Sequence, residues 1–148
     1  MKYQIYIFQK EKEEKFYRKA IDEYKKRLSR YCSVSVKYLR KEKDWDKLNR
    51  SVGDRDLAFV LTAGPVDFSS EDFAARIRVF ENSGVKNLHF FVPPPGDEEG
   101  EMFDVYGDGQ AERMSLSDFT MPPLMTGMIL AEQIYRAYRI LYNQPYHK

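Results

Sequence analysis

Short apolar runs alternate with amphipathic segments along most of the chain, and this alternation restricts the fold more than any other feature. Residues 3–8 (YQIYIF), 57–62 (LAFVLT) and 88–92 (LHFFV) are rich in β-branched and aromatic residues, and 33–39 alternates apolar and polar residues. Runs of this length and composition predict strands. Strands that alternate with helices predict an α/β domain around a mainly parallel sheet, with helices on both faces.

Two of the intervening segments have the periodicity of helices. In residues 12–30, apolar residues recur every four positions and charged residues fill the other faces, as on a half-buried helix. Ser69 and Asp72 form a variant of the capping box at the start of the next predicted helix, and Gly84 is placed to end it.

The last predicted helix opens at Pro122-Pro123 and runs to about Tyr142, with proline near its start as expected. One face carries an apolar and aromatic stripe, made of Leu124, Met128, Ala131, Tyr135, Tyr138 and Tyr142. Such a stripe is typical of a core helix, and Met and Tyr are also favoured at interfaces between subunits. Both interpretations stay open, for different parts of the stripe.

Length and composition predict one cytoplasmic domain over residues 1–148. The chain is 43% hydrophobic and 15% aromatic, which fits a packed globule. No apolar run approaches the ~20 residues of a membrane span, and charged residues follow the first apolar run too closely for a signal peptide. The single cysteine, Cys32, cannot pair within the chain and favours a reducing compartment; a residue at an element boundary is expected there rather than a reactive thiol.

Charge is distributed unevenly although the net charge is only +1. Residues 1–56 hold 17 Lys and Arg and 10 Asp and Glu, a net of +7, whereas residues 57–148 hold 7 and 13, a net of −6. A basic half can face a polyanion such as RNA. Ion pairs four residues apart on a solvated helix account for the same pattern equally well.

Common catalytic motifs do not occur in the sequence. It has no GxxxxGK[ST], no GxSxG, and no His and Cys spacing typical of zinc sites, so we expect no metal. Residues 106–112 (YGDGQAE) hold only half of a dinucleotide-binding pattern and follow no clear strand. His89 falls within a predicted strand, where a hydrogen-bonded structural imidazole is expected. Because ligands bind beyond the carboxyl ends of parallel strands, the candidate ligand loops are 61–65 (LTAGP), 92–96 (VPPPG) and 117–122.

The C-terminal third resembles the end of the SPOUT-class ribosomal RNA large subunit methyltransferase H family. The likeness comprises SLSDFTMPP, then EQIYRA in the last helix, then the terminal PYHK, and the stretches MKYQIYIFQK and LAFVLTAGPVDFSSEDFA also fit. It extends over essentially the whole chain. The resemblance implies a homodimeric cytoplasmic enzyme with a C-terminal trefoil knot that binds S-adenosylmethionine and methylates N3 of a pseudouridine in large-subunit rRNA on the ribosome.

The resemblance also implies a set of site residues. The cofactor would contact Leu61, Gly96, Ser117, Asp118, Phe119, Thr120, Met121 and Pro122, and the catalytic cleft and RNA surface would hold Arg136, Tyr146 and His147. An imidazole titrates near neutrality and suits removal of the N3 proton. A guanidinium can bind phosphate or stabilise a pyrimidine anion, and a tyrosine ring can stack on a base. The alternative for the last residues is a frayed, solvated terminus.

One loop departs from the family pattern. Where the family has a Gly-Gly loop after the strand at 88–92, this chain has PPPGDEEG, with Gly96 as the best counterpart. Three prolines remove three N–H donors, and the acids that begin at residue 97 repel phosphate and carboxylate. Gly127 also stands where the family has an arginine. Two functions follow: a working methyltransferase, or a family-fold protein that no longer binds S-adenosylmethionine and acts as a dimeric ribosome-binding or interaction module.

Overall fold

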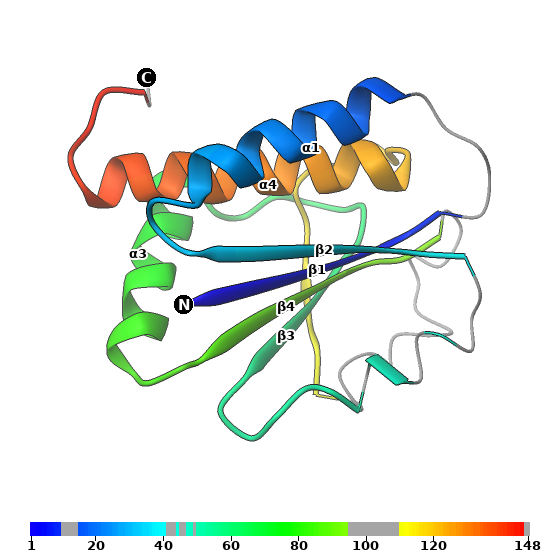
Figure 1. The fold of residues 1–148 in the computed structure, drawn as a ribbon, viewed down its shortest axis with the longest axis horizontal. Coiled ribbons are helices and arrows are strands. Elements are labelled where there is room, and N and C mark those ends of the chain that lie inside the picture. Colours follow the sequence, from blue (N-terminus) through cyan, green and yellow to red (C-terminus); the bar gives the residue numbers. More distant parts are fainter. Residues whose placement is uncertain (10–14, 41–43, 45–46, 49, 95–109, 147–148) are drawn as a thin grey trace.

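A computed structural model of the chain describes residues 1–9, 15–40, 44, 47–48, 50–94 and 110–146. Within this part of the chain, five parallel strands form one sheet in the order β2-β1-β4-β3-β5 (Figure 1). The strands are β1 Lys2–Phe8, β2 Ser33–Leu39, β3 Leu57–Leu61, β4 Asn87–Val92 and β5 Glu112–Met114. The predicted α/β class and parallel sheet are therefore confirmed.

In the described part of the chain, three helices cover one face of the sheet. They are α1 Lys15–Leu28, α3 Ser70–Asn82 and α4 Pro123–Leu141, and Figure 1 shows α1 and α4 side by side along the strands. Their apolar sides bury alternate strand residues such as Tyr3, Ile5 and Ile7. On the opposite face, Tyr6, Phe91 and their neighbours form a smaller cluster that Leu48 helps to cover. Leu48 has helical backbone. Helical residues therefore contact both faces of the sheet, but the described helices α1, α3 and α4 all pack on the first face.

The strand expected within residues 114–120 lies earlier and is shorter. β5 ends at Met114, and its three residues pair with β3 from Phe59 to Leu61. Just beyond it, the Ser115 hydroxyl donates to the carbonyls of Gly64 (2.7 Å) and Ser117 (3.0 Å). These bonds hold residues 115–117 in a loop against Gly64, and the strand ends at Met114.

The boundaries of α3 follow the local signals in the sequence. The Ser69 hydroxyl accepts from the Asp72 N–H at 3.1 Å, and the Asp72 carboxylate accepts from the Ser69 N–H at 3.0 Å. At the other end, Gly84 has a φ of +82°, a conformation that glycine adopts without a Cβ penalty. Both predictions from the sequence are confirmed.

Gly127 brings α4 close to the sheet. A Cβ built at this position would overlap Ile7 Cδ1 and lie 3.3 Å from Ile7 Cγ1 and 3.6 Å from Ile21 Cδ1. Ile7 and Ile21 are both buried. The position therefore has no room for the arginine of the family pattern, and the missing side chain is part of how α4 packs here.

His89 is a structural histidine, as predicted. Its Nδ1 lies 2.8 Å from the Tyr6 hydroxyl, and its Nε2 lies 3.0 Å from Asp56 Oδ2. Asp56 also accepts from the Asn87 amide and the Gly53 N–H, each at 3.0 Å. Burial by itself raises the pKa of Asp56, but these hydrogen bonds outweigh it and leave the pKa below its ordinary value.

Asp56→Asn should destabilise the protein by about 2 kcal/mol at pH 7, because a neutral amide would replace the charge-assisted hydrogen bonds from the Gly53 N–H and the Asn87 amide with weaker ones. A lowered folded-state pKa contributes stability that is present above the unfolded value of about 3.9 and is lost as pH falls through the folded value. The difference in unfolding free energy between wild type and variant should therefore shrink below about pH 4. Urea unfolding from pH 7 to pH 3 measures it, with the exposed Asp54→Asn as control; a gap that stays constant would contradict the assignment.

Candidate functional site

The three predicted ligand loops meet at one pocket beyond the carboxyl ends of β3 and β4. It is an open pocket with about 420 Å³ of unfilled space, counting the space at its mouth. Its walls are Leu61, Thr62, Ala63, Val92, Pro93, Pro94, Leu116, Ser117, Phe119, Thr120, Met121, Pro123 and Thr126. None of these side chains is ionisable, so the described walls offer apolar surface, hydroxyls and main-chain groups.

Hydrogen bonds fix the loops around the pocket relative to one another. The Thr62 N–H donates to the Met114 carbonyl at 2.9 Å, and the Gly64 N–H donates to the Ser117 carbonyl at 3.0 Å. The Ser115 hydroxyl joins the same two loops through the bonds described above. The pocket walls are thereby held in place before any ligand arrives.

Five of the predicted cofactor residues line this pocket: Leu61, Ser117, Phe119, Thr120 and Met121. Asp118 and Pro122 belong to the same loop but not to the lining, and Gly96 lies outside the described residues. The predicted ligand loops 61–65 and 92–96 include five further lining residues, Thr62, Ala63, Val92, Pro93 and Pro94. Leu116, Pro123 and Thr126 were not predicted; they flank the predicted loop 117–122 or follow it in the first turn of α4.

Phe119 stands at the rim of the pocket with 82% of its surface exposed. Its N–H donates to the Ser117 hydroxyl at 2.9 Å, so the backbone is held while the ring is open to solvent. An exposed aromatic ring beside a pocket is a stacking surface for a flat ligand such as a nucleobase.

Arg136 and Tyr146 meet elsewhere, around Glu132. The Glu132 carboxylate accepts from Arg136 Nε (3.0 Å) and Nη2 (2.6 Å) and from the Tyr146 hydroxyl (3.2 Å). The Tyr146 ring lies 5.1 Å from the Arg136 guanidinium carbon and packs edge-on against Tyr135 at 4.9 Å. The tail is therefore docked up to residue 146; His147 lies outside the described residues.

Electrostatics in this cluster follow from its contacts. The hydrogen bonds that Arg136 donates to the Glu132 carboxylate raise the pKa of Arg136, so its guanidinium stays charged. Burial, then a hydrogen bond with Tyr24, raises the pKa of Tyr146, so the phenol stays protonated. Glu132 itself was missed as a site residue, although EQIYRA places it one helical turn before Arg136, where side chains meet.

Within one subunit, the pocket lies apart from the cluster of Glu132, Arg136 and Tyr146, here called the tail cluster. Thr126 lines the pocket and Arg136 follows ten residues later on the same helix. Because an α-helix rises 1.5 Å per residue, the two positions lie about 15 Å apart along α4. Figure 1 shows this helix running the length of the sheet, with the tail at its far end.

Other predicted features have structural roles. Of the stripe on α4, Leu124, Ala131, Tyr135 and Tyr138 are buried within the subunit, whereas Tyr142 is 59% exposed. Burial raises the pKa of Cys32 to about 12, so it is a protonated, unreactive thiol. Among the described residues, no group of His, Cys, Asp and Glu could hold a metal ion, and no helix has the length and apolarity to cross a membrane.

Comparison with known proteins identifies the family of the chain. The profile of the family described as "Predicted SPOUT methyltransferase" matches residues 1–147. A relative from Thermoanaerobacter sp. (strain X514), named "Ribosomal RNA large subunit methyltransferase H 1", is 34% identical over 148 residues and is matched over the whole of both chains. A relative from Clostridioides difficile (strain 630), with the same name without the final numeral, is 34% identical over 151 residues, 91% of this chain and 92% of the relative. The chain belongs to the SPOUT methyltransferase family.

Proposed function

We propose that this chain is an S-adenosylmethionine-dependent methyltransferase that modifies N3 of a pseudouridine in large-subunit ribosomal RNA. The observation that carries the proposal is the pocket at the strand ends, whose walls include Leu61 and most of the segment from Ser117 to Met121. Relatives matched over the full length of this chain are named for methylation of the same class of RNA. With this activity, we expect the protein to act in the cytoplasm, where its ribosomal substrate lies.

The described pocket residues fit the adenosine part of the cofactor better than its amino-acid part. Main-chain groups of residues 117–121 can recognise an adenine edge, and Leu61, Val92 and Met121 offer apolar contact. Pro93 and Pro94 line the pocket but carry no N–H to donate to a carboxylate. The methionine carboxylate would therefore depend on other main-chain donors.

The residues of the chain have separate tasks in the proposed reaction. S-adenosylmethionine, when bound, would supply an electrophilic methyl group whose bond to sulfur breaks, leaving a neutral thioether. His147 takes the proton from N3 of the base as the N–C bond forms. Arg136 exchanges Glu132 for a phosphate or for the developing charge on the pyrimidine. Tyr146 offers a ring for stacking on a base.

A homodimer would unite these parts. The roughly 15 Å along α4 between Thr126 and Arg136 separates the pocket from the tail of the same subunit. A second copy that brings its tail to this pocket would close that gap, and the exposed rings of Tyr142 and Phe119 are available as contacts. The trefoil knot remains a prediction from the resemblance.

Calorimetric titration with S-adenosylmethionine should give a dissociation constant in the micromolar range, and methyl transfer to large-subunit RNA in ribosomes should follow. His147→Ala should slow transfer about a hundredfold, the usual contribution of a general base, with the dissociation constant unchanged. No heat at millimolar cofactor would instead favour a chain that has lost the cofactor and acts as an interaction module. Full activity of His147→Ala would refute its role as the base.

A further inference from the structure

The chain reverses direction directly after α4. Asn143 has a φ of +53°, in the left-handed region, which asparagine tolerates better than most residues. The Gln144 N–H then donates to the Arg139 carbonyl at 2.8 Å. Residues 144–146 consequently return along the outside of the helix and do not extend away from it.

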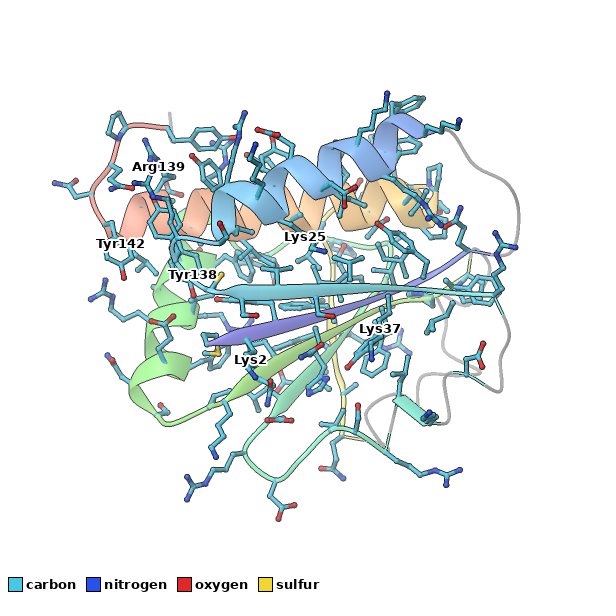
Figure 2. All side chains as sticks on the ribbon, viewed as in Figure 1. Lys2, Lys25, Lys37, Tyr138, Arg139 and Tyr142 are labelled. Carbon is cyan, nitrogen blue, oxygen red and sulfur yellow. The ribbon has the colours of Figure 1, made fainter. Side chains whose placement is uncertain are left out.

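The Arg139 side chain holds this returning segment. Its Nη2 donates to the Pro145 carbonyl at 2.7 Å, and its Nη1 donates to Gln144 Oε1 at 3.1 Å and to the Tyr31 hydroxyl at 3.3 Å. The Tyr31 hydroxyl also donates to Gln144 Oε1. Figure 2 shows Arg139 near the end of α4, beside the segment that follows the helix. One guanidinium thus joins the helix, the turn before β2 and the tail.

The burial of the Arg139 guanidinium also has an unfavourable contribution to stability. Arg139 Nε is buried without a hydrogen-bond partner among the described residues, and an unsatisfied buried donor is unfavourable. An apolar residue beside Tyr135, whose ring lies 5.8 Å from the guanidinium carbon, would avoid that cost. The distinctive contribution of Arg139 is therefore its bond to the tail backbone at Pro145.

We propose that Arg139 is a positioning residue that fixes the C-terminal tail for catalysis. It anchors the carbonyl of Pro145, and Tyr146 is the next residue, with its phenol on Glu132. Two anchor points one residue apart restrict the rotation of the chain that leads to the predicted base. The catalytic consequence rests on the proposed function, whereas the anchoring of the tail does not.

Arg139→Gln should lower kcat at least tenfold, with the dissociation constant of S-adenosylmethionine unchanged because Arg139 does not line the pocket. Arg78→Gln is the matched control, because Arg78 also donates to a carbonyl at the end of this helix, that of Leu141 at 3.2 Å, but does not hold the tail. It should retain kcat within twofold. Arg139→Lys keeps the charge without the two-pronged geometry and should be intermediate. An Arg139→Gln variant within twofold of wild type would overturn the proposal.

A double-mutant cycle separates positioning from a general structural effect. Deletion of residues 147–148 removes His147, the base that Arg139 is proposed to position. Adding Arg139→Gln to the truncated chain should therefore lower kcat no further. A further tenfold loss would show that Arg139 acts through the fold instead. Thermal unfolding of each variant checks that the comparison is made between folded proteins.

Digestion with a broad-specificity carboxypeptidase tests the anchor without any activity. Release of Tyr146, followed by mass spectrometry, should be about tenfold faster in Arg139→Gln than in wild type or Arg78→Gln. Equal release in all three would overturn the anchor even if the enzyme is active. Faster release from a protein that transfers no methyl group would keep the anchor and reject the proposed function.

Discussion

Thr126→Trp should strongly weaken the binding of S-adenosylmethionine while leaving the fold intact. Thr126 lines the pocket from the first turn of α4. Helical backbone restricts side-chain rotamers, so a larger side chain at this position should point in the same direction. An indole at this position would project into the pocket, so a ligand must displace it. Micromolar binding should weaken about a thousandfold, to the millimolar range, which amounts to about 4 kcal/mol. Calorimetry measures the change, and methyl transfer should be lost with it.

Met125→Trp provides the matched control for this substitution. Met125 precedes Thr126 on the same helix but does not line the pocket, so the same indole points about 100° away. Its dissociation constant should remain within about threefold of wild type. If Thr126→Trp bound the cofactor with wild-type affinity while folded, the cofactor would have to occupy another place. If both variants lost binding equally, disruption of α4 would explain the loss better than a filled pocket.

Gly127→Leu should destabilise the protein by about 3 kcal/mol, the upper part of the range for overpacked cores. Glycine inside a helix costs up to about 1 kcal/mol relative to alanine, so helix propensity alone predicts that substitution stabilises. Contact with the buried Ile7 opposes this gain, since even a Cβ would overlap Ile7 Cδ1. We expect the steric cost to exceed the gain, and urea unfolding measures the result.

Removal of the opposing methyl group tests the cause. Ile7→Val deletes Cδ1, so Gly127→Ala should be less harmful, or even stabilising, in the Ile7→Val background than in wild type. The expected interaction energy is about 1 kcal/mol. Gly64→Ala serves as the control glycine, because a Cβ there would meet nothing within 4 Å, and it should change stability by less than about 0.5 kcal/mol. Additive effects of Ile7→Val and Gly127→Ala would contradict the close approach of α4 to β1.

The sequence predicted most elements of the fold because their signals are local. The apolar run of β3 and the capping box of Ser69 and Asp72 depend on neighbours within a few residues. β5 was misplaced because its sequence, ERM, has no apolar pattern. Only its pairing with β3, a residue stretch about 50 positions earlier, makes it a strand.

The candidate site was predictable in part for a related reason. Parallel strands end at one edge of a sheet, so the loops after β3 and β4 had to lie near each other, and the pocket is formed there. No such rule connects Glu132 with Tyr146, because the reversal at Asn143 that joins them depends on the bonds from Arg139. The role of Arg139 therefore could not be predicted from the sequence, because it depends on how the tail packs on α4.

By itself, the sequence determined the α/β class, the strand ends that form the pocket, and the family. These follow from periodicity, capping and motif residues, which act over short distances along the chain. The tertiary structure decided that Gly127 admits α4 to the sheet, that Arg139 holds the tail, and that pocket and tail cluster lie apart on one helix. Such features depend on contacts between residues distant in the chain, whose distances only the packed fold sets.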